Sequence, residues 1–257
     1  MRWSFLFVIA CIGCKGHRHT EAVLPDMTAI TKDYYSWWIY TSGTIHLDRS
    51  FETQNEYGEP MDSKHAFLDS LSTGKFIPIQ LLTKENIEVY RLFSLNTDHH
   101  RDFVETIKQL ARDALDHQYK EGKNLPFFNA KDIQGRGFTT DSLKGKITVL
   151  KTWFIHCLPC VQEFPKLNHI VDSIGNNLPI QFISLARDSP GLLRNFLKTR
   201  TFKYRTVGDV TSYLDDSLKI QTYPTHFIIG KNGKILKVMN TVDDLEYWMK
   251  QLNIRDL

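Results

Sequence analysis

The sequence has few cysteines, no basic block and no long apolar run. Four of its 257 residues are cysteine, and two of these lie close to the N-terminus. The 32 basic and 29 acidic residues are spread along the chain, with a formal net charge of +3. This even spread argues against a nucleic-acid partner. With 42% hydrophobic residues and no internal repeat, the chain is expected to fold into one or two domains with full cores.

The N-terminus is typical of a secretory signal: one arginine, an apolar run, then polar residues. The run is far shorter than the roughly 20 apolar residues of a spanning helix. Small residues before a cysteine resemble the lipobox of bacterial lipoproteins, in which cleavage exposes a cysteine that carries a lipid. Cys11 fits the lipobox consensus better, but Cys14 gives a longer apolar core, and cleavage there leaves no stray thiol in an oxidising compartment. We therefore expect a signal peptide at residues 1–13, lipidation at Cys14 and a tether at residues 14–25.

Residues 26–120 contain no cysteine and no catalytic motif that we recognise. The segment Asn86–Phe93 is strand-like, and a helix is expected to start at Asp98 because apolar residues recur every three to four positions after it. These patterns predict a small α+β region of unknown role.

Residues 121–257 alternate between strand and helix patterns. The run Ile147–Ile155 is suited to a central strand that is covered on both faces. Ser189 and Thr241 are predicted to cap helices, and Asn232-Gly233 is predicted to turn a hairpin. The pattern predicts a sheet between helices.

Two cysteines stand three residues apart in TWFIHCLPCVQEFP, where the predicted central strand gives way to a helix. At a helix start, free N–H groups and the dipole favour the Cys157 thiolate, which can lower its pKa from about 8.5 into a range of about 3.5 to 7.5. Cys160, one turn further on, would be the resolving thiol. A purely structural disulfide would close a tiny loop and add little stability. A zinc site would lack ligands, since only His156 is near.

The same stretch resembles the TlpA/ResA-like branch of the thioredoxin superfamily. The matching residues are Trp153, Cys157, Pro159, Cys160, Glu163 and Pro165. A second family mark is a cis-proline followed by threonine, here Tyr223, Pro224 and Thr225. The resemblance implies an α/β, thioredoxin-like fold, with a central mixed sheet flanked by helices and a βα insertion.

The resemblance also implies which residues act. Cys157 and Cys160 would be catalytic, and the cis-proline would lie beside the disulfide. We add Glu163 to the catalytic residues because of a departure from the family at Lys151. The residues expected to contact substrate are Trp153, His156, Pro159, Tyr223 and Pro224. Among these, the backbone of Tyr223 would pair with an extended client peptide. Pro165 is expected to kink the helix that follows the cysteines.

The sequence departs from the family at two places. His156 stands where tryptophan is common, and it either stabilises the thiolate or is exposed and idle. Lys151 stands where thioredoxins proper carry a buried acid, so we consider Glu163 as the proton acceptor for Cys160. The alternative for Glu163 is an acid that interacts only with the helix dipole.

The expected function is that of an enzyme, a lipid-anchored, periplasmic thiol-disulfide oxidoreductase that acts on client proteins with cysteines. Reduction is the expected direction because Pro159 resembles the reducing members, and relatives serve cytochrome c maturation or disulfide repair. No cofactor is needed, since electrons would come from a membrane partner. The alternatives are a thioredoxin-fold binding module and a Cu(I)-handling protein that uses the two thiols as soft ligands. Peroxidase chemistry is disfavoured because no threonine lies three residues before Cys157.

Overall fold

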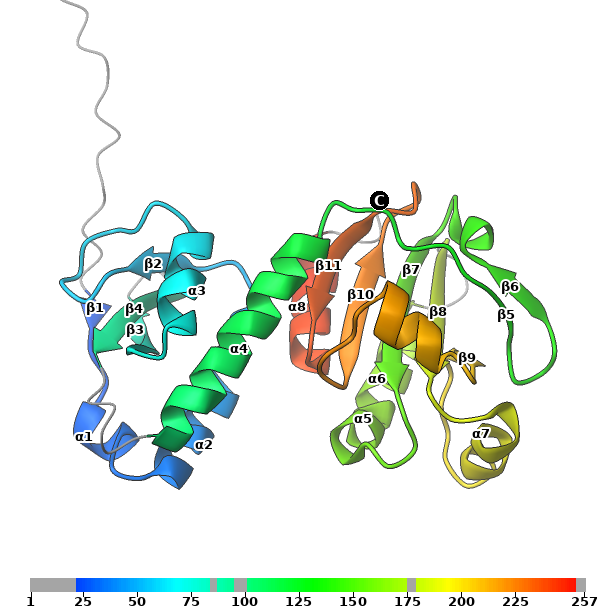
Figure 1. Cartoon of the computed structure of the whole chain (residues 1–257), viewed down its shortest axis with the longest axis horizontal. Helices are drawn as coiled ribbons and strands as arrows, with labels where there is room; N and C mark the ends of the chain where they lie inside the picture. Colours follow the sequence, from blue (N-terminus) through cyan, green and yellow to red (C-terminus); the bar gives the residue numbers. More distant parts are fainter. Residues whose placement is uncertain (1–21, 84–86, 95–100, 175–178, 253–257) are drawn as a thin grey trace, which may run out of the picture.

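A computed structural model describes residues 22–83, 87–94, 101–174 and 179–252. These residues form two lobes connected by a long helix (Figure 1). The expected signal peptide, Cys11, Cys14 and most of the expected tether lie outside the described residues. None of the described helices is both long and apolar enough to cross a membrane.

The N-terminal lobe contains one sheet and four helices. Its elements are β1 (Ala22–Val23), α1 (Met27–Ile30), α2 (Tyr34–Thr44), β2 (Glu52–Gln54), α3 (Lys64–Ser72), β3 (Phe76–Thr83), β4 (Val89–Ser94) and α4 (Arg101–Lys120). The strand order is β1-β3-β4-β2, in which β2 runs parallel to β4 and the other pairs are antiparallel. The strand and the helix expected near Asn86 and Asp98 correspond to β4 and α4.

The core of this lobe joins the helices to the sheet. Trp37 of α2 is fully buried and stacks on Phe103 of α4, with ring centroids 4.9 Å apart. Phe103 and Ile107 belong to the apolar stripe that the sequence pattern predicted for α4, and both are buried. Amphipathic periodicity thus directs one face of α4 into this core.

The second lobe has the expected mixed sheet between helices. Its elements are β5 (Asn129–Lys131), β6 (Gly137–Thr139), η1 (Thr140–Leu143), β7 (Ile147–Trp153), α5 (Leu158–Gln162), α6 (Phe164–Ile174), β8 (Ile180–Ala186), α7 (Pro190–Leu197), β9 (Arg205–Val207), η2 (Tyr213–Ser217), β10 (Thr225–Ile229), β11 (Ile235–Met239) and α8 (Val242–Gln251). The sheet order is β11-β10-β7-β8-β9. Strand β10 runs antiparallel to β7 and β11, whereas β7, β8 and β9 are parallel.

Strand β7 lies at the centre of this sheet and is buried along its whole length. Successive side chains point to opposite faces, so Val149 packs in the cluster with α6 and α8 while Leu150 packs in the cluster on the other face. The strand ends at Trp153, two residues before the predicted end. Because the strand ends early, three loop residues separate it from Cys157.

Local signals position the remaining elements as predicted. Ser189 and Thr241 are the N-caps of α7 and α8, and each accepts a hydrogen bond from the backbone N–H of the third residue of its helix. The hairpin between β10 and β11 turns at Gly233, whose φ of 80° favours glycine. The two caps lie at the edge of the sheet where β7 ends and β10 begins, which carries the candidate site, whereas the hairpin turn lies at the opposite end of β10.

Candidate functional site in the second lobe

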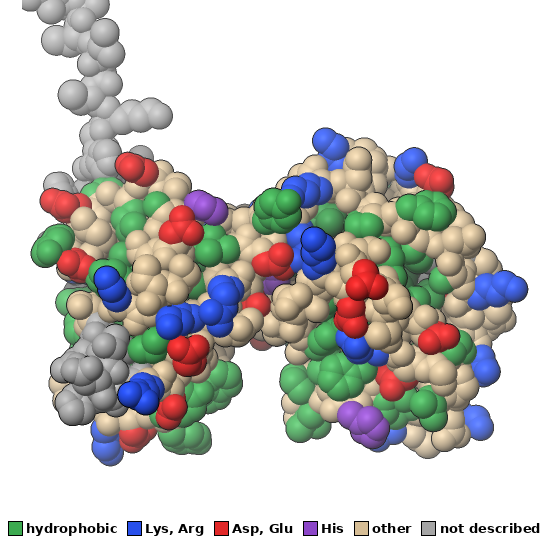
Figure 2. Space-filling model, in the orientation of Figure 1, with side chains coloured by type: hydrophobic (Ala, Val, Ile, Leu, Met, Phe, Trp, Pro, Cys, Tyr) green, Lys and Arg blue, Asp and Glu red, His purple; other side chains and the backbone are tan. Residues whose placement is uncertain are grey.

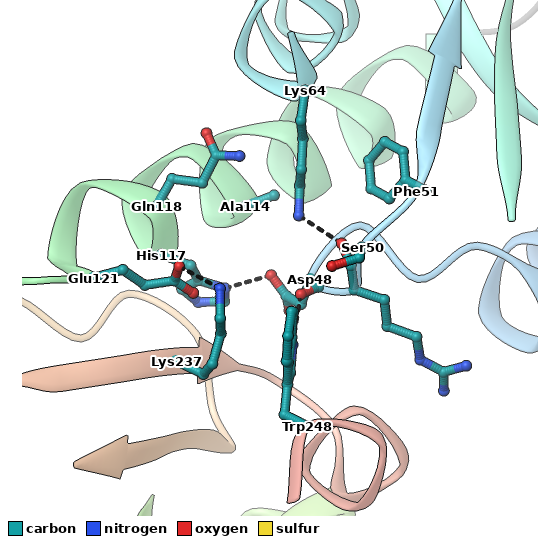
Figure 3. A pocket seen from close by; sticks show the side chains of 11 residues that line it. Asp48, Ser50, Phe51, Lys64, Ala114, His117, Gln118, Glu121, Lys237 and Trp248 are labelled. Atoms are coloured by element: carbon teal, nitrogen blue, oxygen red, sulfur yellow. Dashed lines mark hydrogen bonds and ion pairs between the residues drawn. The ribbon is translucent and has the colours of Figure 1, made fainter. Parts of the chain in front are cut away.

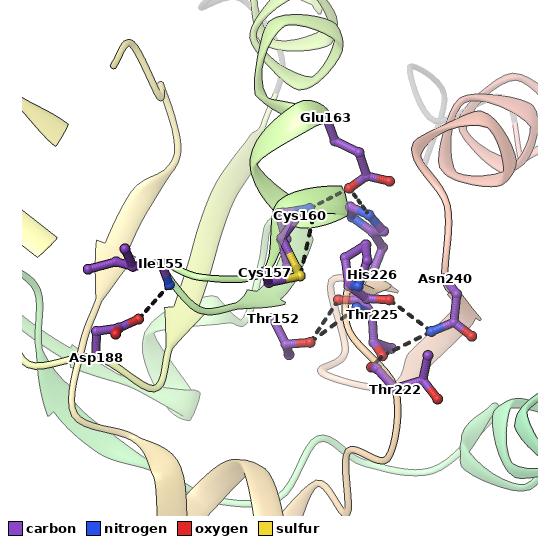
Figure 4. Close-up of a disulfide and its surroundings, with 12 residues drawn as sticks. Thr152, Ile155, Cys157, Cys160, Glu163, Asp188, Thr222, Thr225, His226 and Asn240 are labelled. Atoms are coloured by element: carbon purple, nitrogen blue, oxygen red, sulfur yellow. Dashed lines mark hydrogen bonds and ion pairs between the residues drawn. A yellow bond between two sulfur atoms is a disulfide. The ribbon is translucent and has the colours of Figure 1, made fainter. Parts of the chain in front are cut away.

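The two cysteines form a disulfide at the start of α5 (Figure 4). Their Cα atoms are 5.2 Å apart. Cys157 is the N-cap of the helix, and its Sγ accepts a hydrogen bond of 3.3 Å from the backbone N–H of Cys160. The first sulfur therefore lies at the predicted position, where a free N–H stabilises negative charge.

Solvent reaches the two cysteines unequally. Cys157 keeps 5% of its surface exposed, whereas Cys160 is fully buried in an apolar cluster with Phe164 and Leu193. Leu158, between the cysteines, is 67% exposed. Cys157 is therefore the more accessible of the two cysteines, while Cys160 is covered by protein.

The loop before Cys157 is held from the next strand–helix connection. The carboxylate of Asp188 accepts a hydrogen bond of 2.8 Å from the backbone N–H of Ile155 (Figure 4). Beside this loop lies a groove of about 410 Å³, lined by residues that include His156, Phe196 and Arg200. His156 and Pro159 are both exposed, so these two predicted contact residues are available to a client.

Trp153 is placed differently from His156 and Pro159. Its side chain is fully buried and packs edge to face on Phe164, with ring centroids 5.1 Å apart. The ring has no surface for a client to contact in this structure. Trp153 instead packs in the apolar cluster that contains both cysteines.

The helix after the cysteines is interrupted, as Pro165 predicts. Helix α5 ends at Gln162 and α6 begins at Phe164, with Glu163 between them. Proline has no N–H to donate to the carbonyl of Val161, and the N–H of Glu163 bonds to that carbonyl instead. The break turns the Glu163 side chain towards the sheet.

The peptide bond before Pro224 is cis, as predicted. Pro224 is buried, and Tyr223 packs against the cluster that contains both cysteines. The Tyr223 ring also contacts Phe154 edge to face, and its hydroxyl accepts a hydrogen bond from Arg187 at 3.1 Å. Within the described part of the chain, the backbone N–H and C=O of Tyr223 form no hydrogen bond. They are available to an extended peptide.

A buried ionic group lies beneath the disulfide. Lys151 of β7 and His226 of β10 are direct cross-strand partners, and both are fully buried. The carboxylate of Glu163 covers them: it forms an ion pair with Lys151 and contacts His226 Nε2 at 3.0 Å. Its second oxygen accepts a hydrogen bond of 2.9 Å from the N–H of Val242 (Figure 4 shows Glu163 and His226). One carboxylate thus joins two strands and the start of α8.

The contacts of Glu163 set its charge. Burial alone would raise its pKa, but His226 and Lys151 together outweigh that effect and lower the pKa to about 2. Burial lowers the pKa of His226, with Lys151 acting in the same direction, so the imidazole is neutral and donates from Nε2. A carboxylate with so low a pKa takes up a proton poorly near neutral pH. That Glu163 accepts the Cys160 proton stays a prediction, and its contacts favour an anchoring role.

Sequence reasoning missed His226 and Asp188. His226 follows the cis-proline by two positions, but its pairing with Lys151 depends on the register of two strands far apart in the sequence. Among the described residues, no group of three or more histidine, cysteine or acidic side chains is placed to hold a metal ion.

The segment that carries this site is similar to known proteins. Residues 122–238 match the model of the AhpC/TSA family. The thiol-disulfide oxidoreductase ResA of Bacillus cereus is 27% identical over 135 residues, which is 51% of this chain and 78% of ResA. ResA of Bacillus subtilis is 29% identical over 120 residues, 46% of this chain and 66% of ResA. The thioredoxin domain of a thiol-disulfide oxidoreductase from Bacteroides vulgatus is a structural neighbour, with a TM-score of 0.47, 19% identity and coverage of 51% of this chain and 96% of that one.

The fold and the disulfide site define a thiol-disulfide oxidoreductase of the thioredoxin superfamily. The second lobe carries this resemblance, since the match to the AhpC/TSA family model covers residues 122–238. Residues 26–120 lie outside the matched segment.

Proposed function

We propose that this protein is a lipid-anchored reductase on the periplasmic side of a bacterial membrane, and that it reduces disulfides in client proteins. The signal-like N-terminus with Cys14 supports the anchor and the location, and Pro159 supports the direction of electron flow. We infer that its clients are proteins whose cysteines must be kept reduced, as in cytochrome c maturation or disulfide repair.

The observation that carries the proposal is the arrangement around Cys157. Its sulfur caps a helix, is the more accessible of the pair, and shares an apolar cluster with Tyr223. The free backbone groups of Tyr223 can pair with an extended client segment next to the sulfur, which holds the client disulfide for attack.

The reaction starts from the reduced protein. The Cys157 thiolate attacks one client sulfur, so a mixed disulfide forms and the other client sulfur leaves as a thiolate. Cys160 then loses its proton and attacks the Cys157 sulfur, which releases the second client thiolate. Two electrons pass to the client, and the product is the Cys157–Cys160 disulfide seen in the structure. A membrane reductant would return two electrons to this disulfide.

Trapping of mixed disulfides tests this reaction in cells. The C160S variant should accumulate client adducts that dithiothreitol releases, because the mixed disulfide can no longer be resolved. C157S is the matched control and should form none. Equal yields of adducts from the two variants, or none from either, would contradict the proposal.

The direction and the anchor need separate measurements. We expect a reduction potential nearer to the value of about −270 mV for thioredoxin than to about −120 mV for DsbA. A redox titration against glutathione or dithiothreitol measures it. Incorporation of labelled palmitate should be lost in C14S and kept in C11S; the reverse pattern would assign the lipid to Cys11.

A further inference from the structure

The loop that carries the cis-proline is in contact with the N-terminal lobe. Asp113 of α4 accepts a hydrogen bond of 2.9 Å from the hydroxyl of Thr222, which lies two residues before Pro224. The other oxygen of Asp113 is held by the side-chain amide of Gln109 at 2.8 Å. The helix thus presents a fixed acceptor to the loop.

A second path reaches the same loop through Asp48. Its carboxylate contacts Nδ1 of the buried His117 at 2.7 Å and accepts a hydrogen bond of 3.3 Å from the backbone N–H of Asn240. The Asn240 side chain in turn donates to the Pro224 carbonyl at 2.9 Å and to the Thr225 hydroxyl at 3.1 Å. Figure 4 shows Asn240 turned towards Thr225. Two hydrogen bonds, both made by Asn240, therefore connect Asp48 of the N-terminal lobe to the carbonyl of Pro224.

Polar contacts, rather than continuous apolar packing, line this junction. A cavity of about 260 Å³ lies between the lobes, lined by residues that include Asp48, Lys64, His117, Lys237 and Trp248 (Figure 3). The indole N–H of Trp248 donates to the backbone carbonyl of Asp48 at 2.8 Å. Hydrogen bonds and ion pairs, such as that of Arg49 with Asp244 at 2.6 Å, connect the lobes around this cavity.

We propose that the N-terminal lobe positions the cis-proline loop for client binding, with Asp113 and Asp48 as the positioning residues. This inference rests on the proposed function and gives residues 26–120 a role in it. A client strand can pair with Tyr223 at low entropic cost only if residues 222–225 are already ordered. The chemistry at Cys157 needs no such pairing when the substrate is a small disulfide.

Two classes of substrate distinguish an effect on client positioning from an effect on the chemistry at Cys157. In the full-length protein, D113A should raise the KM for a protein disulfide, such as that of insulin, about tenfold, the loss expected for one hydrogen bond to a charged group. Its rate with a small aromatic disulfide should stay within about twofold of wild type. T222V removes the same bond from the other side, and the double variant should be no worse than either single one.

E121A is the matched control. Glu121 directly follows α4 and forms a 2.8 Å ion pair with Lys237 of β11, but it does not contact residues 222–225. E121A should leave both substrates unaffected. If E121A raises the KM as much as D113A does, or if D113A slows both substrates equally or neither, the inference is wrong.

Amide hydrogen exchange tests the same inference without catalysis. D113A should speed exchange at Thr225, whose backbone N–H donates to the Thr152 hydroxyl at 3.2 Å, whereas E121A should not. Unchanged exchange in D113A would overturn the inference. A wild-type protein that exchanges with neither class of disulfide would refute the proposed function instead. The exchange measurement would still decide whether Asp113 orders the loop.

Discussion

The two lobes bury their polar residues differently. In the N-terminal lobe, the buried polar residues described are Thr41, Thr53 and His117, and His117 faces the junction. The second lobe buries Lys151 and His226 side by side in the centre of its sheet. Buried charge lowers stability unless it is paired, and in the second lobe Glu163 pairs with Lys151 beneath the disulfide. The N-terminal lobe contributes through its contacts with that lobe.

Replacement of Cys157 should lower the rate of disulfide exchange more than any other change, because it removes the chemistry of the second lobe. C157S removes the nucleophile, and disulfide exchange should fall about a thousandfold or more with every substrate. A turnover assay with insulin and with a small disulfide measures the loss. If C157S keeps an exchange rate close to that of wild type, Cys157 is not the nucleophile, and the chemical distinction between the two lobes is wrong.

A matched pair of tryptophans compares the lobes directly. Trp37 and Trp153 are both fully buried, one in each lobe. Each alanine variant should lower the free energy of unfolding by about 3–5 kcal/mol. Only W153A should also shift the reduction potential, because Trp153 packs in the cluster that holds the disulfide. An equal shift in W37A would show that the two cores are not separate.

Glu163 tests the buried charges of the second lobe. E163Q leaves the buried Lys151 without its anion and should cost about 3–5 kcal/mol in a denaturant titration. The double variant K151M/E163Q removes both charges and should recover part of that loss. If the double variant is less stable than E163Q, the pair stabilises the fold through some interaction other than charge compensation.

The pH dependence of stability should show a smaller and more gradual effect of the same group. The pKa of Glu163 is lowered from 4.5 to about 2, so its contribution is complete above about pH 4.5 and is lost as the pH falls towards 2. His226, whose pKa is lowered from 6.5, adds a loss that begins as the pH falls below 6.5. Thermal unfolding of wild type and E163Q at several pH values should show a smaller loss between about pH 4.5 and pH 2 in the variant, which keeps Asp132, whose pKa is also lowered to about 2.

Local signals made much of the second lobe predictable. The Ser189 and Thr241 caps, the turn at Asn232-Gly233 and the break at Pro165 each depend on a few neighbouring residues. The contacts of His226 were not predictable in this way, because they require the register of β10 against β7. The N-terminal lobe shows the same limit: the helical stripe of α4 was visible, whereas the parallel pairing of β2 with β4 needs the whole fold.

The hydrogen bond from the Trp248 indole to the Asp48 carbonyl joins residues that are 200 positions apart in the sequence. Synthesis proceeds from the N-terminus, so Asp48 emerges long before the helix that completes its contacts. The junction that orders residues 222–225 is therefore among the last parts of the molecule to assemble. We therefore expect the disulfide to form in a growing chain before that chain is able to bind a client.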